Sequence, residues 1–233
     1  MAEALTFVGA ASVGIIGVVI GTRAPLSGRA TALVAVSCAA LLAIVGVARA
    51  RSPWVAPVVD ACLIGIAWAI GGAVGSRIEH PGHLLPAAAV AASADVVSVA
   101  SSWGPSHAIA ESERALAILA IHFPVAGTRI VAPALGVGDL VFVALLLAAA
   151  RAHGLSRNKL GWLSWFGVLI AGLAAAVSRR PIPALPAIGA LVIAFVPEAR
   201  RLRPKDRPVA TIAIGVSIVA AAVAVLGAVR GTS

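Results

Sequence analysis

The sequence predicts an all-α membrane protein, a polytopic bundle of about eight transmembrane helices. Hydrophobic residues make up 61% of the 233-residue chain, and its mean hydropathy is +1.03. Soluble globular domains contain only about 45–50% apolar residues. Apolar runs long enough to cross a hydrocarbon layer, which takes about 20 helical residues, recur along the whole length. No stretch is left over for a separate soluble domain.

The predicted spans follow one another as a single transmembrane domain, residues 1–233. The first run has only Glu3 as a charged residue before it, so it lacks the basic segment of a cleaved signal peptide and is expected to be retained. Small residues dominate the runs, which favours close approach of helix backbones. The runs cover about residues 4–21, 30–48, 54–75, 84–101, 134–150, 160–178, 183–197 and 209–229.

The formal charge of +9 comes from Lys and Arg residues in short segments beside the apolar runs. This placement indicates orientation by the positive-inside rule rather than binding of nucleic acid. Cys38 and Cys62 stand singly inside predicted helices, and neither they nor the histidines show the spacing of metal ligands. The sequence therefore predicts no metal site and no cofactor, and the lipid bilayer is the one partner that composition demands.

Three of the four aspartates lie inside predicted spans: Asp60, Asp95 and Asp139. The fourth, Asp206, belongs to the basic segment "EARRLRPKDRP" and is expected to be solvated or paired. An ionised carboxylate in hydrocarbon is costly, so intramembrane acids face a protein or water interior and are candidates for function. A structural hydrogen bond is the alternative for each of them.

Two sequence segments suggest a function for these acids beyond a structural hydrogen bond. Asp139 follows Gly136 and Gly138 in "GVGD", where the lack of side chains allows local unwinding and close approach of another peptide. The segment "PALP" at 183–186 opens the seventh predicted span. Prolines at the start of a helix donate no amide and fix irregular backbone, so this segment can shape a cleft, although a plain helix start explains it as well.

These pieces resemble, in the same order, the presenilin and signal peptide peptidase family of GxGD intramembrane aspartyl proteases. The segment "DVVSVASSWGPSHAIAES", which begins with Asp95, is similar to the family's first catalytic aspartate and the residues that follow it. "GVGDLVFVALLLAAA" resembles the second catalytic helix, and "PALP" resembles the P-A-L segment. The similarity covers about residues 84–197, preceded by helices in 1–83 and followed by a basic segment and a further helix in 198–233.

Outside this core the chain departs from the family pattern. The tyrosine that usually precedes the first catalytic aspartate is Ala94 here, and the chain contains no tyrosine. Only three predicted spans precede the Asp95 helix, and an additional span follows the P-A-L helix.

The resemblance implies a fold with a presenilin-like catalytic core and an intramembrane endopeptidase that cuts single-span membrane proteins or signal-peptide remnants. It implies that Asp95 and Asp139 are catalytic, share one proton and act as base and acid on water and the scissile peptide. It further implies that an unwound substrate strand adds to "TRIVAPALG" and "PALP". The residues so implied in substrate binding are Gly136, Val137, Gly138, Pro183, Ala184, Leu185 and Pro186.

Three other functions remain open on the sequence. A prepilin-peptidase-like enzyme also uses G-x-G-D, but the P-A-L segment and the Gly-Pro step after Asp95 count against it. A proton-coupled transporter would use Asp60, Asp95 and Asp139 as a relay, although the internal repeats typical of transporters are not evident. A protein of this fold could also bind membrane peptides without cutting them. For Asp60 a hydrogen bond across helices is expected, and for His122 an interfacial position.

Charge counting predicts a multi-pass protein of the cell membrane with both termini outside the cytoplasm. With eight spans, the side that holds the termini carries seven Lys and Arg residues and the opposite side eleven. Five of the eleven lie in the segment after the P-A-L helix, which the positive-inside rule places in the cytoplasm. The oligomeric state is left open.

Overall fold

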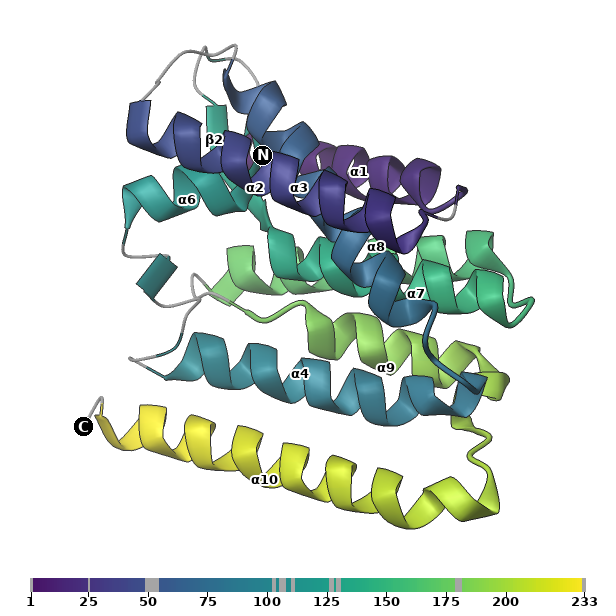
Figure 1. Ribbon diagram of the computed structural model, residues 1–233. Coiled ribbons are helices and arrows are strands. Elements are labelled where there is room, and N and C mark those ends of the chain that lie inside the picture. Colours follow the sequence, from purple (N-terminus) through teal and green to yellow (C-terminus); the bar gives the residue numbers. More distant parts are fainter. Residues whose placement is uncertain are drawn as a thin grey trace. The chain divides into compact units, whose positions relative to one another are not determined.

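A computed structural model describes residues 2–24, 26–48, 55–101, 104, 108–109, 112–125, 128, 131–178 and 182–231. These residues are mostly helical (Figure 1). A helix lies at each apolar run that the sequence predicts, and the ends agree to within a few residues because hydropathy changes sharply at the polar connections. The helices at these runs are α1 (Ala2–Gly21), α2 (Gly28–Ala48), α3 (Val55–Gly75), α4 (Leu84–Ala100), α7 (Val137–Ala152), α8 (Arg157–Ser178), α9 (Leu185–Phe195) and α10 (Arg207–Gly231).

Short elements complete the fold. They are the helix α6 (Glu113–Leu119), the strands β1 (Ala120–Pro124) and β2 (Val131–Gly136), and the 3-10 turns η1 (Pro81–His83), η2 (Pro197–Arg200) and η3 (Pro204–Asp206). The sequence predicted a connection over about residues 102–133 and a span from about residue 134. α6 and β1 are therefore elements that hydropathy did not indicate, and β2 continues to Gly136, so α7 begins at Val137.

Five described helices are long and apolar enough to cross a membrane: Gly28–Val47, Val55–Gly75, Pro81–Ala100, Arg157–Ser178 and Pro204–Ala228. Two apolar helices are shorter, Thr6–Gly21 and Leu185–Phe195. Large apolar side chains are exposed on α2 and α10, including Val47 at 77% and Val209 at 71%. Such surfaces are stable in lipid rather than in water, so the chain is a helical membrane protein, as predicted.

Two compact units make up the chain, and each is described by itself. Unit 1 comprises residues 1–77 and 113–165, and unit 2 comprises residues 78–112 and 166–233. The division falls within α8, whose first nine residues belong to unit 1. Residues of the segment 84–197 contribute to both units.

Helix α7 forms the core of unit 1. Nine of its 16 residues are buried, between Leu140 and Ala150. Helix α3 lies along it, with Gly71 and Gly75 turned toward the α7 backbone at Val141 and Leu145. A Cβ on either glycine would collide with a backbone carbonyl of α7, so the two helices approach as closely as small-residue membrane packing permits.

The hairpin β1–β2 leads directly into α7. The strands are antiparallel, from Ala120 opposite Gly136 to Pro124 opposite Val131, with an irregularity between Ile121 and His122. Ile121 and Leu135 are buried, and the hairpin packs against α1 and α3. This packing holds β2 at the start of α7, the helix that carries Asp139.

In unit 2, α4 packs against both α9 and α10, and Figure 1 shows it between them. Gly189 of α9 faces Ala88 of α4, so the two helices lie close together. The part of α8 that belongs to unit 2 reaches α9 where Gly167 faces the backbone of Ile188. The helices that carry Asp95 and the P-A-L segment are therefore direct neighbours.

Candidate functional site

Asp95 and the P-A-L segment meet within unit 2. The backbone amide of Leu185 donates a hydrogen bond of 3.0 Å to Asp95 Oδ2. Asp95 lies in the second half of α4 and is half-buried. A carboxylate that accepts a backbone amide is held in one orientation, since charge-assisted hydrogen bonds are among the stronger ones in proteins.

The position of Leu185 at the start of α9 explains why its amide is available to Asp95. α9 begins at Leu185, with Ala184 at its N-cap and Pro186 in its first turn. The first amides of a helix have no intrahelical acceptor and require one from outside. The Asp95 carboxylate supplies that acceptor for Leu185, and its negative charge is favourable at a helix N-terminus. Pro183, immediately before, is half-buried.

Asp139 lies in the first turn of α7, directly after β2. Gly136 ends the strand and is the N-cap of the helix, with extended backbone at φ −72° and ψ 148°. A Cβ on Gly136 would lie 3.6 Å from Asp139 Oδ2, whereas one on Gly138 would meet nothing within 4 Å. The glycines therefore leave open space beside a half-buried carboxylate. Val137, between them, is also half-buried.

The two predicted catalytic aspartates belong to different units, Asp139 to unit 1 and Asp95 to unit 2. Asp139 follows two exposed glycines, and Asp95 lies on a helix next to the P-A-L segment. Their approach to one another concerns the relation between the units and stays a prediction. Pro105 and neighbouring residues of the Gly-Pro segment lie outside the described part of the chain.

Asp60 makes a hydrogen bond to another element, as the sequence predicted, but the partner differs from the predicted one. Its Oδ1 accepts the backbone amide of His122 at 2.8 Å, and the His122 Nδ1 lies 3.5 Å from the same oxygen. Asp60 thus bonds across elements as expected, but its partner is the strand β1 rather than a helix. The hydrogen bond falls where the strand pairing is irregular, so it satisfies an amide at the bulge of the hairpin.

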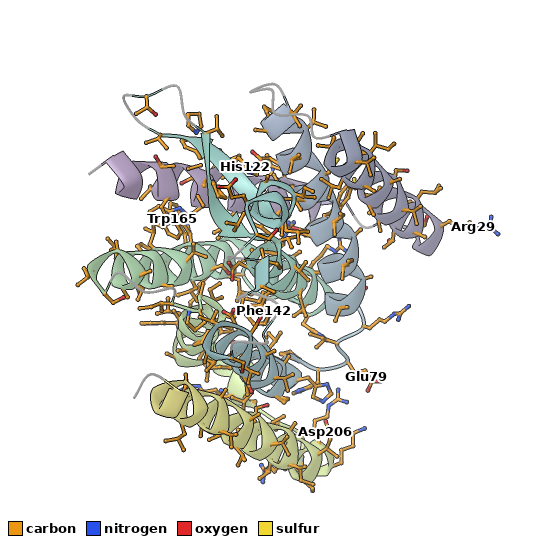
Figure 2. The ribbon with its side chains drawn as sticks, turned by 90° about the vertical axis from the view of Figure 1, so that its left-hand side faces the viewer. Arg29, Glu79, His122, Phe142, Trp165 and Asp206 are labelled. Atoms are coloured by element: carbon orange, nitrogen blue, oxygen red, sulfur yellow. The ribbon has the colours of Figure 1, made fainter. Side chains whose placement is uncertain are left out.

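The Asp60–His122 pair borders a cavity of about 410 Å³. Both side chains are close to nine-tenths buried, with 13% and 10% of their side-chain surface exposed. The His122 Nδ1 is buried and has no hydrogen-bond partner among the described residues. Figure 2 shows His122 on the hairpin of unit 1. The other lining residues are Val13, Ala56, Pro57, Ala61, Ile64, Phe123, Pro124 and Val131.

Asp206 is paired, one of the two outcomes that the sequence allowed. His83 Nε2 lies 3.0 Å from Asp206 Oδ2, which joins η1 to η3 within unit 2. In the part of the chain that the structure describes, no three His, Cys, Asp or Glu side chains come together as metal ligands. No protein-family model, no curated protein and no solved structure matches this chain.

Sequence reasoning missed β1 and the His122 partner of Asp60. The run "AIHFP" contains a β-branched and an aromatic residue, but it directly follows the apolar residues of α6, and five residues give too short a signal for a strand. The partner of Asp60 lies 62 residues away in the chain, and no local pattern connects them.

Proposed function

We propose that this chain is an intramembrane aspartyl endopeptidase that resembles presenilins and signal peptide peptidases. Asp95 and Asp139 form its catalytic pair, and its substrates are membrane-spanning segments of single-span proteins or signal-peptide remnants. In this proposal the eight apolar runs that the sequence predicts all cross the cell membrane. The residues around 84–197 form the catalytic core.

The hydrogen bond from Leu185 to Asp95 carries the proposal. If Asp95 and the P-A-L segment occurred in the same chain only by chance, a hydrogen bond between them would not be expected. The P-A-L backbone instead lies against Asp95, one of the two carboxylates that the family resemblance selects, although 90 residues separate the two in sequence. A hydrogen bond from an amide orients the carboxylate and stabilises its charge, as a group that activates water requires.

The hairpin before Asp139 supports a mode of substrate binding. A substrate helix hides its peptide bonds in intrahelical hydrogen bonds, so it must unwind before water reaches them. A two-stranded sheet has an outer edge on each strand, where an extended peptide can add its own backbone hydrogen bonds. β2 ends at Gly136, three residues from Asp139, so a peptide along this strand would reach the carboxylate. The open space at Gly138 allows that approach.

The chemistry then follows that of an aspartate pair. Two carboxylates held close together retain one proton between them. The ionised member takes a proton from water as the oxygen of that water attacks the scissile carbonyl carbon. The protonated member donates to the carbonyl oxygen, and the C–N bond breaks as the amide nitrogen receives a proton. The products are a carboxylic acid and an amine.

Incubation of the purified protein in lipid vesicles with a single-span substrate tests the proposal. We expect cleavage by the wild type and a loss of about 10² to 10⁴-fold in the variants Asp95→Asn and Asp139→Asn, the range for removal of an acid–base group. Asparagine keeps an oxygen that can accept the Leu185 amide, so Asp95→Asn preserves the local structure. Undiminished cleavage by both variants would contradict the assignment.

One observation favours a second candidate, a proton-coupled transporter. Asp60 and His122 form a buried acid–imidazole pair beside a cavity, an arrangement that can pass a proton. The variant Asp60→Asn separates the two functions. A transporter that uses this pair loses proton-coupled uptake in vesicles, whereas the protease is expected to retain cleavage because Asp60 is not a member of its catalytic pair.

A further inference from the structure

One end of unit 1 carries a group of basic residues. The segments 22–31, 76–77 and 151–159 follow α1, α3 and α7, and together they contain no Asp or Glu. Like charges gathered without acids attract anions, and the attraction is strongest where side chains converge. The basic residues of these segments are Arg23, Arg29, Arg77, Arg151, Arg157 and Lys159.

A small cavity opens where these segments meet. Its volume is about 90 Å³, close to the size of a single tetrahedral oxyanion rather than of a whole organic ligand. Arg151 lines it, together with the hydroxyl residues Thr22, Thr31 and Ser76 and the indole of Trp68. All of these residues belong to unit 1. The cavity thus combines a cation with hydroxyl groups at the positive end of the unit.

The arginines around the cavity retain capacity for an anion. Arg151 donates Nη1 to the carbonyl of Thr22 at 3.0 Å, which leaves most of its guanidinium donors for other acceptors. Arg157 donates Nη2 to Thr22 Oγ1 at 3.1 Å, while its Nε is buried without a partner among the described residues. Arg157 also lies close enough to Arg151 and Arg23 for their charges to repel one another. A bound anion would relieve that repulsion.

The hydroxyl groups can turn toward such an anion. Thr31 Oγ1 and Ser76 Oγ each donate to a carbonyl of an adjacent turn at 3.0 Å. Both are on the exposed or half-buried rim of the cavity. A hydroxyl hydrogen rotates freely about the C–O bond, so each group can donate to a ligand oxygen instead.

The position of the cavity relates it to the bilayer. It lies at the first residues of the candidate span Gly28–Val47 and the last residues of Val55–Gly75, the level at which a membrane protein meets lipid headgroups. Directly beyond it, α2 exposes Leu33 and Val36 to 67% each. A headgroup in the cavity would therefore have an apolar helix face beside its acyl chains.

We propose that this cavity binds the phosphate group of an anionic glycerophospholipid. Arg151 supplies the principal charge-assisted hydrogen bond, Thr31 and Ser76 supply hydroxyl donors, and α2 accommodates the acyl chains. A net negative headgroup is required because a zwitterionic lipid brings its own cation to an end of the unit that is already positive.

The test uses the full chain in nanodiscs of phosphatidylcholine into which phosphatidylglycerol is titrated, with bound lipid measured by native mass spectrometry. Arg151→Gln should weaken phosphatidylglycerol binding about tenfold, the effect of one charge-assisted hydrogen bond. Ala73→Met should weaken it similarly, because Ala73 lines the cavity and the longer side chain fills it while every arginine is kept. The second variant keeps the test decisive if Arg151→Gln does not fold.

The matched control is Arg29→Gln, which removes the same charge from a side chain that points away from the helices (Figure 2). Its binding of phosphatidylglycerol should stay within about twofold of wild type. An equal loss in Arg29→Gln and Arg151→Gln would show a diffuse charge effect and overturn the site. Unchanged binding in both cavity variants would overturn it as well. Inorganic phosphate that binds as tightly as the lipid would overturn the lipid assignment.

Discussion

The amide of Leu185 donates a 3.0 Å hydrogen bond to the carboxylate of Asp95, across 90 residues of sequence. The contact joins the start of α9 to the second half of α4 within one compact unit. A helix N-terminus and an intramembrane acid thereby satisfy one another, which explains how a carboxylate can be retained in an apolar helix.

A charge introduced at the P-A-L segment should stop cleavage. In Leu185→Glu the new carboxylate would stand beside Asp95 and compete for the same amide and protons. We expect cleavage to fall at least about a hundredfold, because a second negative charge near Asp95 alters which carboxylate is protonated. Leu185→Met, which keeps an apolar side chain of similar volume, should retain most activity. Full activity in the glutamate variant, measured by product formation in vesicles, would remove the segment from the site.

Replacement of Gly138, the residue before Asp139, should lower kcat/KM without destabilising the fold. Gly138→Ala adds a methyl group in open space within a helix, so the free energy of unfolding should stay the same or rise by about 0.5–1 kcal/mol. If the substrate backbone approaches there, kcat/KM should drop about tenfold to hundredfold.

The matched control is Gly71→Ala, in which the new methyl group meets the α7 backbone at Val141. Thermal unfolding should show a destabilisation of about 1–3 kcal/mol for this variant. Equal unfolding temperatures for the two glycine variants would contradict the packing described for α3 and α7.

Cleavage should depend on pH as a bell-shaped curve. The reaction requires one ionised and one protonated carboxylate, so the rate falls at low pH when both are protonated and at high pH when both are ionised. The measurement is initial rate against pH in buffers of constant ionic strength. A rate that rises steadily to a plateau with increasing pH would be inconsistent with a pair that shares one proton.

The hydrogen bond between Asp60 and the hairpin should contribute to stability. Asp60→Ala leaves the buried His122 amide without an acceptor, which costs about 1–3 kcal/mol. Asp60→Asn keeps an acceptor oxygen and should cost less, and His122→Ala keeps the backbone donor and should also cost less. Thermal unfolding in detergent ranks the three variants. A loss in Asp60→Asn as large as in Asp60→Ala would mean that charge, rather than the hydrogen bond, is what the hairpin needs.

Orientation can be measured with introduced cysteines. In a background in which Cys38 and Cys62 are replaced by alanine, we expect an impermeant thiol reagent to label Thr128→Cys on intact cells and to leave Lys205→Cys unlabelled. The reason is the excess of basic residues on the side of Lys205, which the positive-inside rule assigns to the cytoplasm. The reverse pattern of labelling would place both termini in the cytoplasm.

The sequence determined the helices and where the motifs sit on them. Runs of apolar residues between polar connections predict membrane helices because a bilayer requires every backbone amide to be bonded within its own segment. The local chemistry of proline likewise placed a helix start within residues 183–186, and the structure has it at Leu185. These are features of neighbouring residues, so a local pattern is sufficient to indicate them.

Only the tertiary structure decided which residues meet. Asp95 accepts the Leu185 amide, Asp60 accepts the His122 amide, and a hairpin precedes α7, each through a partner that is distant in sequence. In an almost wholly apolar helix every face can be buried, so hydropathy does not show which face meets which neighbour. Close packing at glycines such as Gly71 makes that choice, and the polar partners follow from it.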